Sequence, residues 1–254
     1  MNDSLMKYSQ YIENDTLLWT MTSNGYKYLT YNLYLSLKKA DVKQKLLILC
    51  VDKESHTFFR SMNVPSFFYK PLKPVLPGTQ PSQFGSDTFM SYNLMKLEMC
   101  EHIRLNYTNA KYVIYMDGDI VVFRNFIEYI KLQFEEKNCS FLFQCDDLYD
   151  SLNKTQCCTG FFAFKQDTFD KSPFVVYDTK LWKEIREDQP WVNRHIRMYN
   201  IPFDYLERSL FPNGVYIKDE RWKNSEPYLL HFNHIVGNAK ISTMKRLKMW
   251  YHTY

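Results

Sequence analysis

The chain has 254 residues, of which 45% are hydrophobic and 17% aromatic, and its 32 basic and 28 acidic residues give a formal net charge of +4. The apolar content provides for a buried core and excludes a disordered chain, while so small a basic excess does not favour a nucleic-acid-binding protein. The six cysteines show no C-x-x-C spacing, so we expect buried thiols instead of a zinc site or disulfides. There is no signal-like N-terminus and no run of about 18 apolar residues. We therefore expect a soluble, cytoplasmic protein without an integral membrane segment, with the lumen of the secretory pathway as the alternative.

The first part of the chain alternates strand and helix patterns. Residues 15–22 predict a strand, which is followed by a turn and by a helix whose leucines recur every fourth residue from Leu29. The pattern repeats with a buried strand over residues 45–52 and a helix over residues 54–62. Two successive strand–helix units indicate a parallel sheet, with a ligand site at the carboxyl ends of its strands.

The middle of the chain contains a long loop and an unusual strand. Residues 70–87 hold four prolines, which predicts a loop and a mobile lid. A helix is expected over residues 89–105, and after it comes YVIYMDGDIVVF, an apolar run over residues 112–123 that two acids interrupt. No internal repeat or linker divides the chain, so we expect a single domain over residues 1–254 with a core of about 15–245. The further elements expected are a helix over residues 125–136, strands over 140–147 and 159–165, an amphipathic helix over 174–187, and short strands at 214–217 and 227–231.

The acids in that run, Asp117 and Asp119, lie two positions apart. On an extended backbone both carboxylates point the same way, so together they can hold one hard divalent cation. Gly118 between them would let a large ligand approach the main chain. Unpaired acids in so apolar a run are costly to bury, which makes a counter-ion the expected reason for them. The pattern predicts a metal–diphosphate site, and the alternative is an ordinary strand end whose acids cap the next turn.

A second polar group follows the strand pattern PYLLH. His231 ends that pattern, and His234, Gly237 and Lys240 come after it. An imidazole that joins two carboxylates favours manganese over calcium, because calcium prefers oxygen ligands alone. Lys240 could reach a diphosphate as a point charge. His234 is the alternative ligand to His231, and for either histidine a purely structural role is the competing interpretation.

With these motifs the chain resembles GT-A nucleotide-diphospho-sugar transferases, and it is most similar to the retaining glycosyltransferase family 77, which is related to family 8. The resemblance implies an α/β, Rossmann-like single domain with a mostly parallel central sheet flanked by helices. It also implies metal-dependent transfer of a sugar, with retention of anomeric configuration, from a nucleotide-diphosphate donor, a UDP-sugar, to a hydroxyl acceptor. The acceptor would be a glycan, a glycoprotein or a small hydroxyl compound. The matching segments, in the family's order, are TSNGYKYLTYNLYLSLKK, FGSDTFMSYNLMKLEMC, YVIYMDGDIVVFRNF, FLFQCDD, TGFFAFK, DQPWVN, FPNGVYIK and HFNHIVGNAK.

The resemblance also implies roles for single residues. Asp117 and Asp119 would bind Mn²⁺, or Mg²⁺, and the first acid would also approach the ribose of the donor. His231 would be the third metal ligand in the family pattern H-x-N-x-x-x-G, whereas the spacing in family 8 would select His234. The other residues implied to bind the nucleotide sugar are Thr22, Asn24, Lys96, Gly118 and Lys240.

The catalytic candidates are acids and an amide near the presumed sugar. Asp188 and Gln189 match the family's D-Q pair, and Asp147 ends a strand beside the presumed cleft. Without the resemblance, a helix N-cap and a solvated turn explain these residues equally well. Retention would require a carboxylate nucleophile or same-face attack by the acceptor, and the sequence leaves both routes open.

Two other classes of protein compete with a glycosyltransferase. A haloacid-dehalogenase-like phosphatase also has an apolar strand that ends in D-x-D, although its motif usually precedes the other strand–helix units. The third class is a catalytically silent module that binds nucleotide sugars. Activity on an aryl phosphate would favour the phosphatase, and metal-dependent hydrolysis of the donor would separate an enzyme from a binding module.

Overall fold

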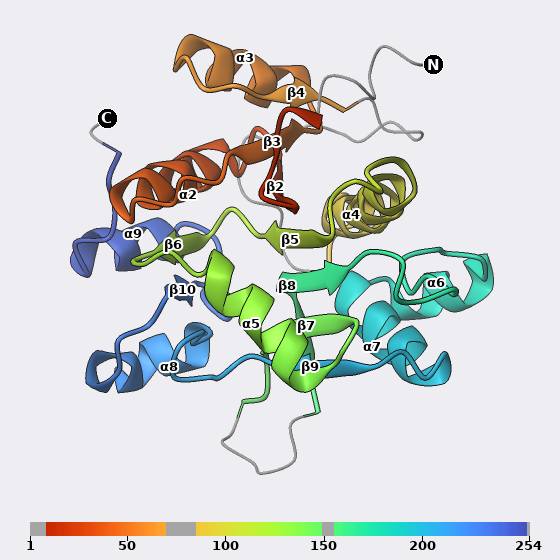
Figure 1. Ribbon diagram of the computed structural model, residues 1–254. Helices are drawn as coiled ribbons and strands as arrows, with labels where there is room; N and C mark the ends of the chain where they lie inside the picture. Colours follow the sequence, from red (N-terminus) through yellow and green to blue (C-terminus); the bar gives the residue numbers. More distant parts are fainter. Residues whose placement is uncertain (1–8, 70–84, 149–154, 253–254) are drawn as a thin grey trace.

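An eight-stranded sheet forms the centre of the computed structural model (Figure 1). The structure describes residues 9–69, 85–148 and 155–252. Most of the predicted proline-rich lid, residues 70–84, therefore lies outside the described residues. From one edge to the other, the strands are β4 (Phe67–Phe68), β3 (Leu46–Cys50), β2 (Thr16–Thr22), β5 (Tyr112–Met116), β8 (Cys157–Lys165), β7 (Phe141–Cys145) and β9 (Phe203–Tyr205), and β1 (Ile12–Glu13) pairs with β2.

Most neighbouring strands run parallel, which confirms the predicted mostly parallel sheet. The exceptions are β1, which is antiparallel to β2, and β8, which is antiparallel to both β5 and β7. Because β8 is reversed, its first residues lie beside the carboxyl end of β5. Met116 is in register with Phe161, and the main-chain N–H of Asp117 donates to the carbonyl of Gly160 over 2.7 Å. The reversal therefore places the start of β8 next to the acid pair.

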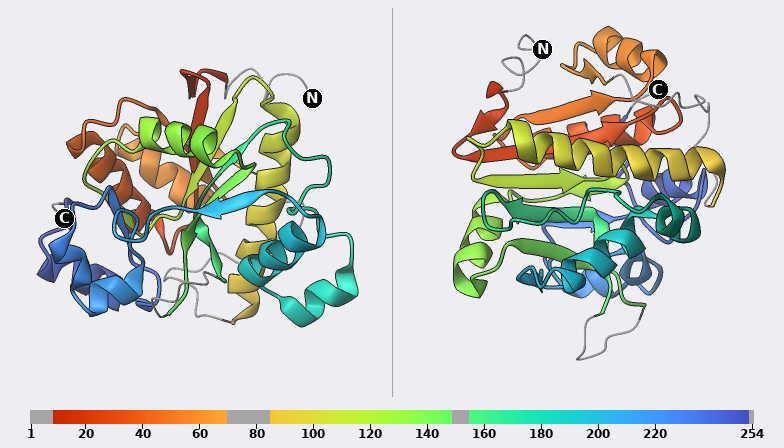
Figure 2. Two further views of the ribbon diagram at one scale, coloured as in Figure 1. Left: turned by 60° about the horizontal axis from the view of Figure 1, so that its bottom comes forward. Right: turned by 90° about the vertical axis from the view of Figure 1, so that its right-hand side faces the viewer.

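Helices cover both faces of the sheet (Figure 2). Successive side chains of a strand point to opposite faces, so Leu17 and Trp19 of β2 pack on one side and Leu18 on the other. The first side carries α4 (Asp87–Asn106), α6 (Thr179–Ile185) and α7 (Asp188–Met198). The second side carries α2 (Lys27–Lys39), α3 (Lys53–Ser61) and α5 (Ile127–Lys137). The strand–helix units predicted for the first part of the chain are confirmed.

A small second sheet brings the C-terminal part of the chain to the acid pair. Strand β6 (Ile120–Val122) follows Asp119 directly and pairs antiparallel with β10 (Leu229–His231), with His231 opposite Ile120. The apolar side chains of these strands pack against α8 (Gly214–Lys218) and α9 (Ala239–Arg246). A short 3₁₀ turn, Arg221–Asn224, follows α8. This pairing fixes the histidine beside acids that are far away in the sequence.

Two predicted elements were wrong. Residues 214–217, expected to be a strand, form the helix α8, because the side chain of Asn213 accepts a hydrogen bond from the N–H of Val215 and caps its first turn. The amphipathic helix expected over residues 174–187 is reduced to α6, which begins only after the cap at Asp178. No residue of α6 is fully buried, and its apolar residues Leu181, Trp182 and Ile185 pack against the core as partly buried side chains.

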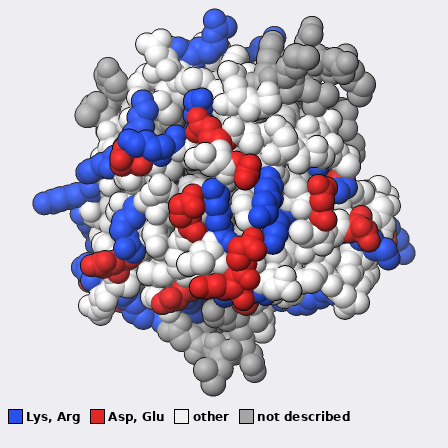
Figure 3. All heavy atoms as spheres, in the orientation of Figure 1, with Lys and Arg blue, Asp and Glu red and all other residues white. Residues whose placement is uncertain are grey.

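The thiols and the surface agree with the composition. All six cysteines are buried and unpaired, as expected. On the face shown in Figure 3, basic and acidic side chains are interspersed, so this face has no continuous basic surface. None of the helices that the structure describes combines the length and the apolar character needed to cross a membrane.

Candidate functional site

A pocket of about 640 Å³ opens at the carboxyl ends of β2 and β5, where the strand–helix pattern predicts a ligand site. Its described lining comes from the end of β2, from α4, from the turn between β5 and β6, from the start of β8, from the start of α7 and from the segment after β10. Acidic side chains outnumber basic ones here, so an anionic ligand in this pocket needs a cation beside it. The acids are Asp117, Asp119, Asp146, Glu187 and Asp188, and the lysines are Lys96 and Lys240.

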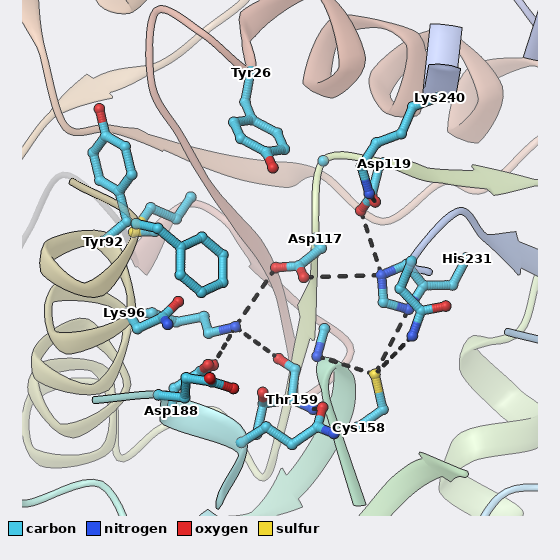
Figure 4. Close-up of a pocket in the computed structure, with 18 of the residues that line it drawn as sticks. Tyr26, Tyr92, Lys96, Asp117, Asp119, Cys158, Thr159, Asp188, His231 and Lys240 are labelled. Atoms are coloured by element: carbon cyan, nitrogen blue, oxygen red, sulfur yellow. Dashed lines mark hydrogen bonds and ion pairs between the residues drawn. The ribbon is translucent and has the colours of Figure 1, made fainter. Parts of the chain in front are cut away.

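Asp117, Asp119 and His231 form one compact cluster of potential metal ligands (Figure 4). Each residue offers a ligand atom, and these atoms lie within 4.8 Å of one another. His231 Nε2 is 3.3 Å from Asp119 Oδ1 and 3.8 Å from Asp117 Oδ2. Nε2 is also a buried atom that has no hydrogen-bond partner among the residues that the structure describes. Two carboxylates and an imidazole nitrogen that lacks a partner fit a divalent transition-metal ion.

Two glycines make room for this cluster and its surroundings. A Cβ atom built on Gly160 of β8 would lie 2.3 Å from His231 Cε1 and 2.6 Å from Asp117 Oδ2. A Cβ atom on Gly118 would lie 2.2 Å from Thr30 Oγ1 of α2. Gly118 lines the pocket, and its missing side chain also makes room for α2.

Replacement of Gly160 by alanine should therefore disrupt this cluster of potential metal ligands. The added methyl group overlaps the buried His231 ring and a carboxylate oxygen, so one of the two ligands must move. We expect Mn²⁺ affinity to fall by about 10-fold or more, as when the orientation of a ligand is lost. Titration of the folded variant with Mn²⁺ measures this, and wild-type affinity would show that the crowding is relieved elsewhere.

Lys96 links the acid pair to the start of α7. It is buried on α4, forms an ion pair with Asp188, lies 3.7 Å from Asp117 Oδ1 and donates to the carbonyl of Thr159 over 3.2 Å (Figure 4). Burial lowers the pKa of Lys96, but Asp117 and Asp188 outweigh burial and raise it above its ordinary value. This lysine therefore remains charged and joins the predicted catalytic segment to the metal cluster.

Lys240 holds the other side of the cluster. It forms an ion pair with Asp119 and donates to the carbonyl of Phe232 over 2.9 Å. Burial alone would raise the pKa of Asp119, but Lys240 and His231 together lower it well below its ordinary value. Lys240 lies in the pocket, where the sequence predicts a contact with the diphosphate, and in this structure Asp119 is its partner.

Asp146 accepts hydrogen bonds from several polar side chains that line the pocket. His234 Nε2 lies 3.0 Å from Asp146 Oδ1, and Gln189 donates its amide N–H to Asp146 Oδ2 over 3.0 Å. Burial raises the pKa of Asp146, but the hydrogen bonds from His234 and Gln189 outweigh it, so the pKa is lowered. His234 therefore contacts Asp146, and His231 is the histidine that lies with the acid pair.

The structure brings most of the predicted site residues to the pocket, but not all of them. Thr22 lines it. Asn24 does not, because its N–H donates to Asp52 Oδ2 over 2.7 Å and its side chain accepts from Lys27. Asp147 also lies outside the described lining, and its carboxylate accepts hydrogen bonds from the main chain and hydroxyl of Thr155.

Sequence reasoning missed two residues that shape the cluster. Gly160 was part of a matching segment, but nothing in the sequence shows which side chain a Cβ atom would meet there. Gln144 is a fully buried amide within the apolar strand β7 and hydrogen-bonds to His231. A polar residue in an otherwise apolar strand was the available signal for Gln144.

The comparisons with known proteins agree with this geometry. The sequence pattern of the nucleotide-diphospho-sugar transferase family matches residues 42–244. A search of curated protein sequences finds no match.

Three of the solved structures with a similar fold are glycosyltransferases. GlyE of Streptococcus pneumoniae TIGR4 has 12% identity and a TM-score of 0.51, and the alignment covers 93% of this chain and 61% of that one. A glycosyltransferase involved in the glycosylation of the major capsid of PBCV-1 has 10% identity, a TM-score of 0.53 and coverage of 92% and 98%. The galactosyltransferase LgtC has 7% identity, a TM-score of 0.56 and coverage of 85% and 86%. At these identities the similarity establishes the fold alone, and it confirms the predicted GT-A architecture.

Proposed function

Because this chain belongs to the nucleotide-diphospho-sugar transferase family, we propose that it transfers a sugar from a UDP-sugar to a hydroxyl acceptor in a reaction that requires a divalent cation. The cluster of Asp117, Asp119 and His231 is the observation that carries this proposal. It lies in a pocket that has an excess of acids, where a nucleotide diphosphate would be repelled without a counter-ion.

The three residues of the cluster would hold Mn²⁺, or Mg²⁺. When bound, the ion supplies charge stabilisation for the departing diphosphate oxygens. Lys240 is already beside Asp119 and would add a positive charge at the same place. Lys96 keeps Asp117 and Asp188 within one charge network, which limits the movement of both carboxylates before a donor binds.

We assign the sugar to the side of the pocket formed by the start of α7. Asp188 and Gln189 both line it there. The amide of Gln189 is fixed at both ends, since it donates to Asp146 and accepts from the N–H of Thr159 over 3.3 Å. Retention of configuration and membership of family 77 are part of the proposal, as is a glycan, glycoprotein or small hydroxyl compound as the acceptor. The LgtC structure with a similar fold contains donor and acceptor sugar analogs, which is consistent with a pocket that receives both substrates.

A panel of nucleotide sugars tests the proposal. Each donor is incubated with Mn²⁺, with Mg²⁺ or with a chelator, and the released nucleoside diphosphate is measured with and without candidate acceptors. We expect release from a UDP-sugar that depends on the ion and increases with the right acceptor. Ion-independent release, or hydrolysis of an aryl phosphate without any reaction of nucleotide sugars, would contradict the proposal. The family match favours neither the phosphatase nor the silent binding module.

A further inference from the structure

The buried amide of Gln144 lies between two main-chain carbonyls and the ring of His231. Gln144 is 0% exposed. Its Nε2 donates to the carbonyl of Phe211 over 3.0 Å and to the carbonyl of Pro212 over 3.1 Å. Its Oε1 lies 2.7 Å from His231 Nδ1. Both N–H groups of this amide and its oxygen therefore have protein partners.

These contacts determine which way the amide faces. Carbonyl oxygens only accept hydrogen bonds, so the NH₂ group must face Phe211 and Pro212, and Oε1 must face His231. Oε1 in turn only accepts, so the hydrogen bond of 2.7 Å requires a proton on His231 Nδ1. In a neutral ring, Nε2 then carries the lone pair. That atom faces Asp117 and Asp119.

The main chain of His231 is anchored at the same place. Its N–H donates to the carbonyl of Pro212 over 3.2 Å, and Pro212 is also a partner of the Gln144 amide. Cys158 Sγ is a more distant neighbour, 3.7 Å from Nδ1. A histidine that binds a metal usually donates its other ring N–H to a protein oxygen, which fixes the tautomer and the ring orientation.

We propose that Gln144 is a positioning residue that keeps His231 in the Nδ1–H tautomer and presents Nε2 to the metal ion. This inference rests on the metal site of the proposed function, and it adds a residue that does not touch the metal or the substrates. It requires no sugar transfer and can be tested with the metal alone.

The variant Gln144→Met removes the oxygen acceptor while it keeps a long side chain in the core. We expect Mn²⁺ to bind about 10- to 100-fold more weakly, the usual cost of losing such an outer partner. Binding is measured by titration of the folded protein with Mn²⁺, with the signal of the free ion followed by electron paramagnetic resonance.

Gln44 provides a matched control. Its Nε2 is also buried and also donates to two main-chain carbonyls, those of Tyr11 at 3.2 Å and Thr16 at 2.7 Å, but it does not line the pocket. Gln44→Met should lose a comparable amount of stability and bind Mn²⁺ like the wild type. Equal loss of Mn²⁺ affinity in both variants would show a general structural effect and overturn the proposal, as would wild-type affinity in Gln144→Met.

The tautomer gives a second readout that needs no metal. In protein with ¹⁵N-labelled histidine, the wild-type His231 ring should show a protonated Nδ1, and Gln144→Met should shift it towards the other tautomer. A neutral wild-type His231 ring with its proton on Nε2 instead of Nδ1 would overturn the inference. Failure of the wild type to bind Mn²⁺ would also overturn it. If Mn²⁺ affinity and tautomer respond as expected while no donor is cleaved, the proposed transferase function fails and the role of Gln144 stands.

Discussion

Asp119→Asn is expected to abolish measurable Mn²⁺ binding and to reduce release of UDP from the donor by about 10²- to 10³-fold or more, the range for removing one electrostatic group from an active site. Asp119 is the residue on which both sides of the cluster depend, because it lies 3.3 Å from His231 Nε2 and also pairs with Lys240. An amide oxygen is a weaker ligand, and the lost charge leaves the pocket less able to hold a cation. Metal titration and donor cleavage measure the two effects separately.

A loss of folding must be distinguished from a loss of function in this variant. Asp119 and Lys240 are both buried, so Asp119→Asn leaves a buried lysine without its carboxylate, at a cost of about 3–5 kcal/mol. The double variant Asp119→Asn/Lys240→Met removes both charges and should recover much of that stability in denaturant unfolding. It should still fail to bind Mn²⁺. Recovery of metal binding in the double variant would contradict the role of Asp119 as a ligand.

Asp188→Asn is expected to leave donor affinity within about threefold of the wild type and to reduce sugar transfer by about 10²-fold or more, the size typical of a lost catalytic group. The structure gives a reason to expect slow transfer without a loss of donor affinity. Asp188 lies on the α7 side of the pocket and, among the described residues, is connected to Asp117 through Lys96. Equilibrium binding of UDP-sugar with Mn²⁺, compared with the rate of transfer to an acceptor, tests the assignment.

The control for Asp188 is an acid–lysine pair outside the pocket. Asp204 of the edge strand β9 lies 3.3 Å from Lys137, and it is not among the described residues that line the pocket. Asp204→Asn should leave both donor affinity and transfer unchanged. A parallel loss of donor affinity and transfer in Asp188→Asn would show that Asp188 serves donor binding, and would contradict its assignment as a catalytic residue.

The sequence predicted the parts of the fold that depend on local patterns. Alternating strands and helices from residue 15 to residue 62 correctly indicated a parallel sheet, and the acids of YVIYMDGDIVVF do lie at the carboxyl end of a buried strand. The GT-A resemblance is confirmed by the family match and by the fold. These features could be predicted because each depends on patterns within short stretches of consecutive residues.

Features that depend on contacts between residues far apart in the sequence could not be predicted. The pairing of β6 with β10 decides that His231 joins the acids, whereas His234 adopts a left-handed backbone, with φ of 57°, and turns to Asp146. Spacing alone left both histidines open. Asn24 and Asp147 were named from their place in a motif, but Asn24 is hydrogen-bonded to Asp52 and Lys27, and Asp147 to Thr155. The short segment at residues 214–217 looked like a strand because its helix is capped by side chains outside it, those of Asn213 and of the distant Asn233.

A crystal structure with Mn²⁺ and UDP, with anomalous data collected at the manganese edge, tests the central claim most directly. We predict one strong anomalous peak, from a manganese ion that contacts carboxylate oxygens of Asp117 and Asp119, His231 Nε2 and the diphosphate. A peak elsewhere, or UDP bound with neither aspartate touching an ion, would contradict the account.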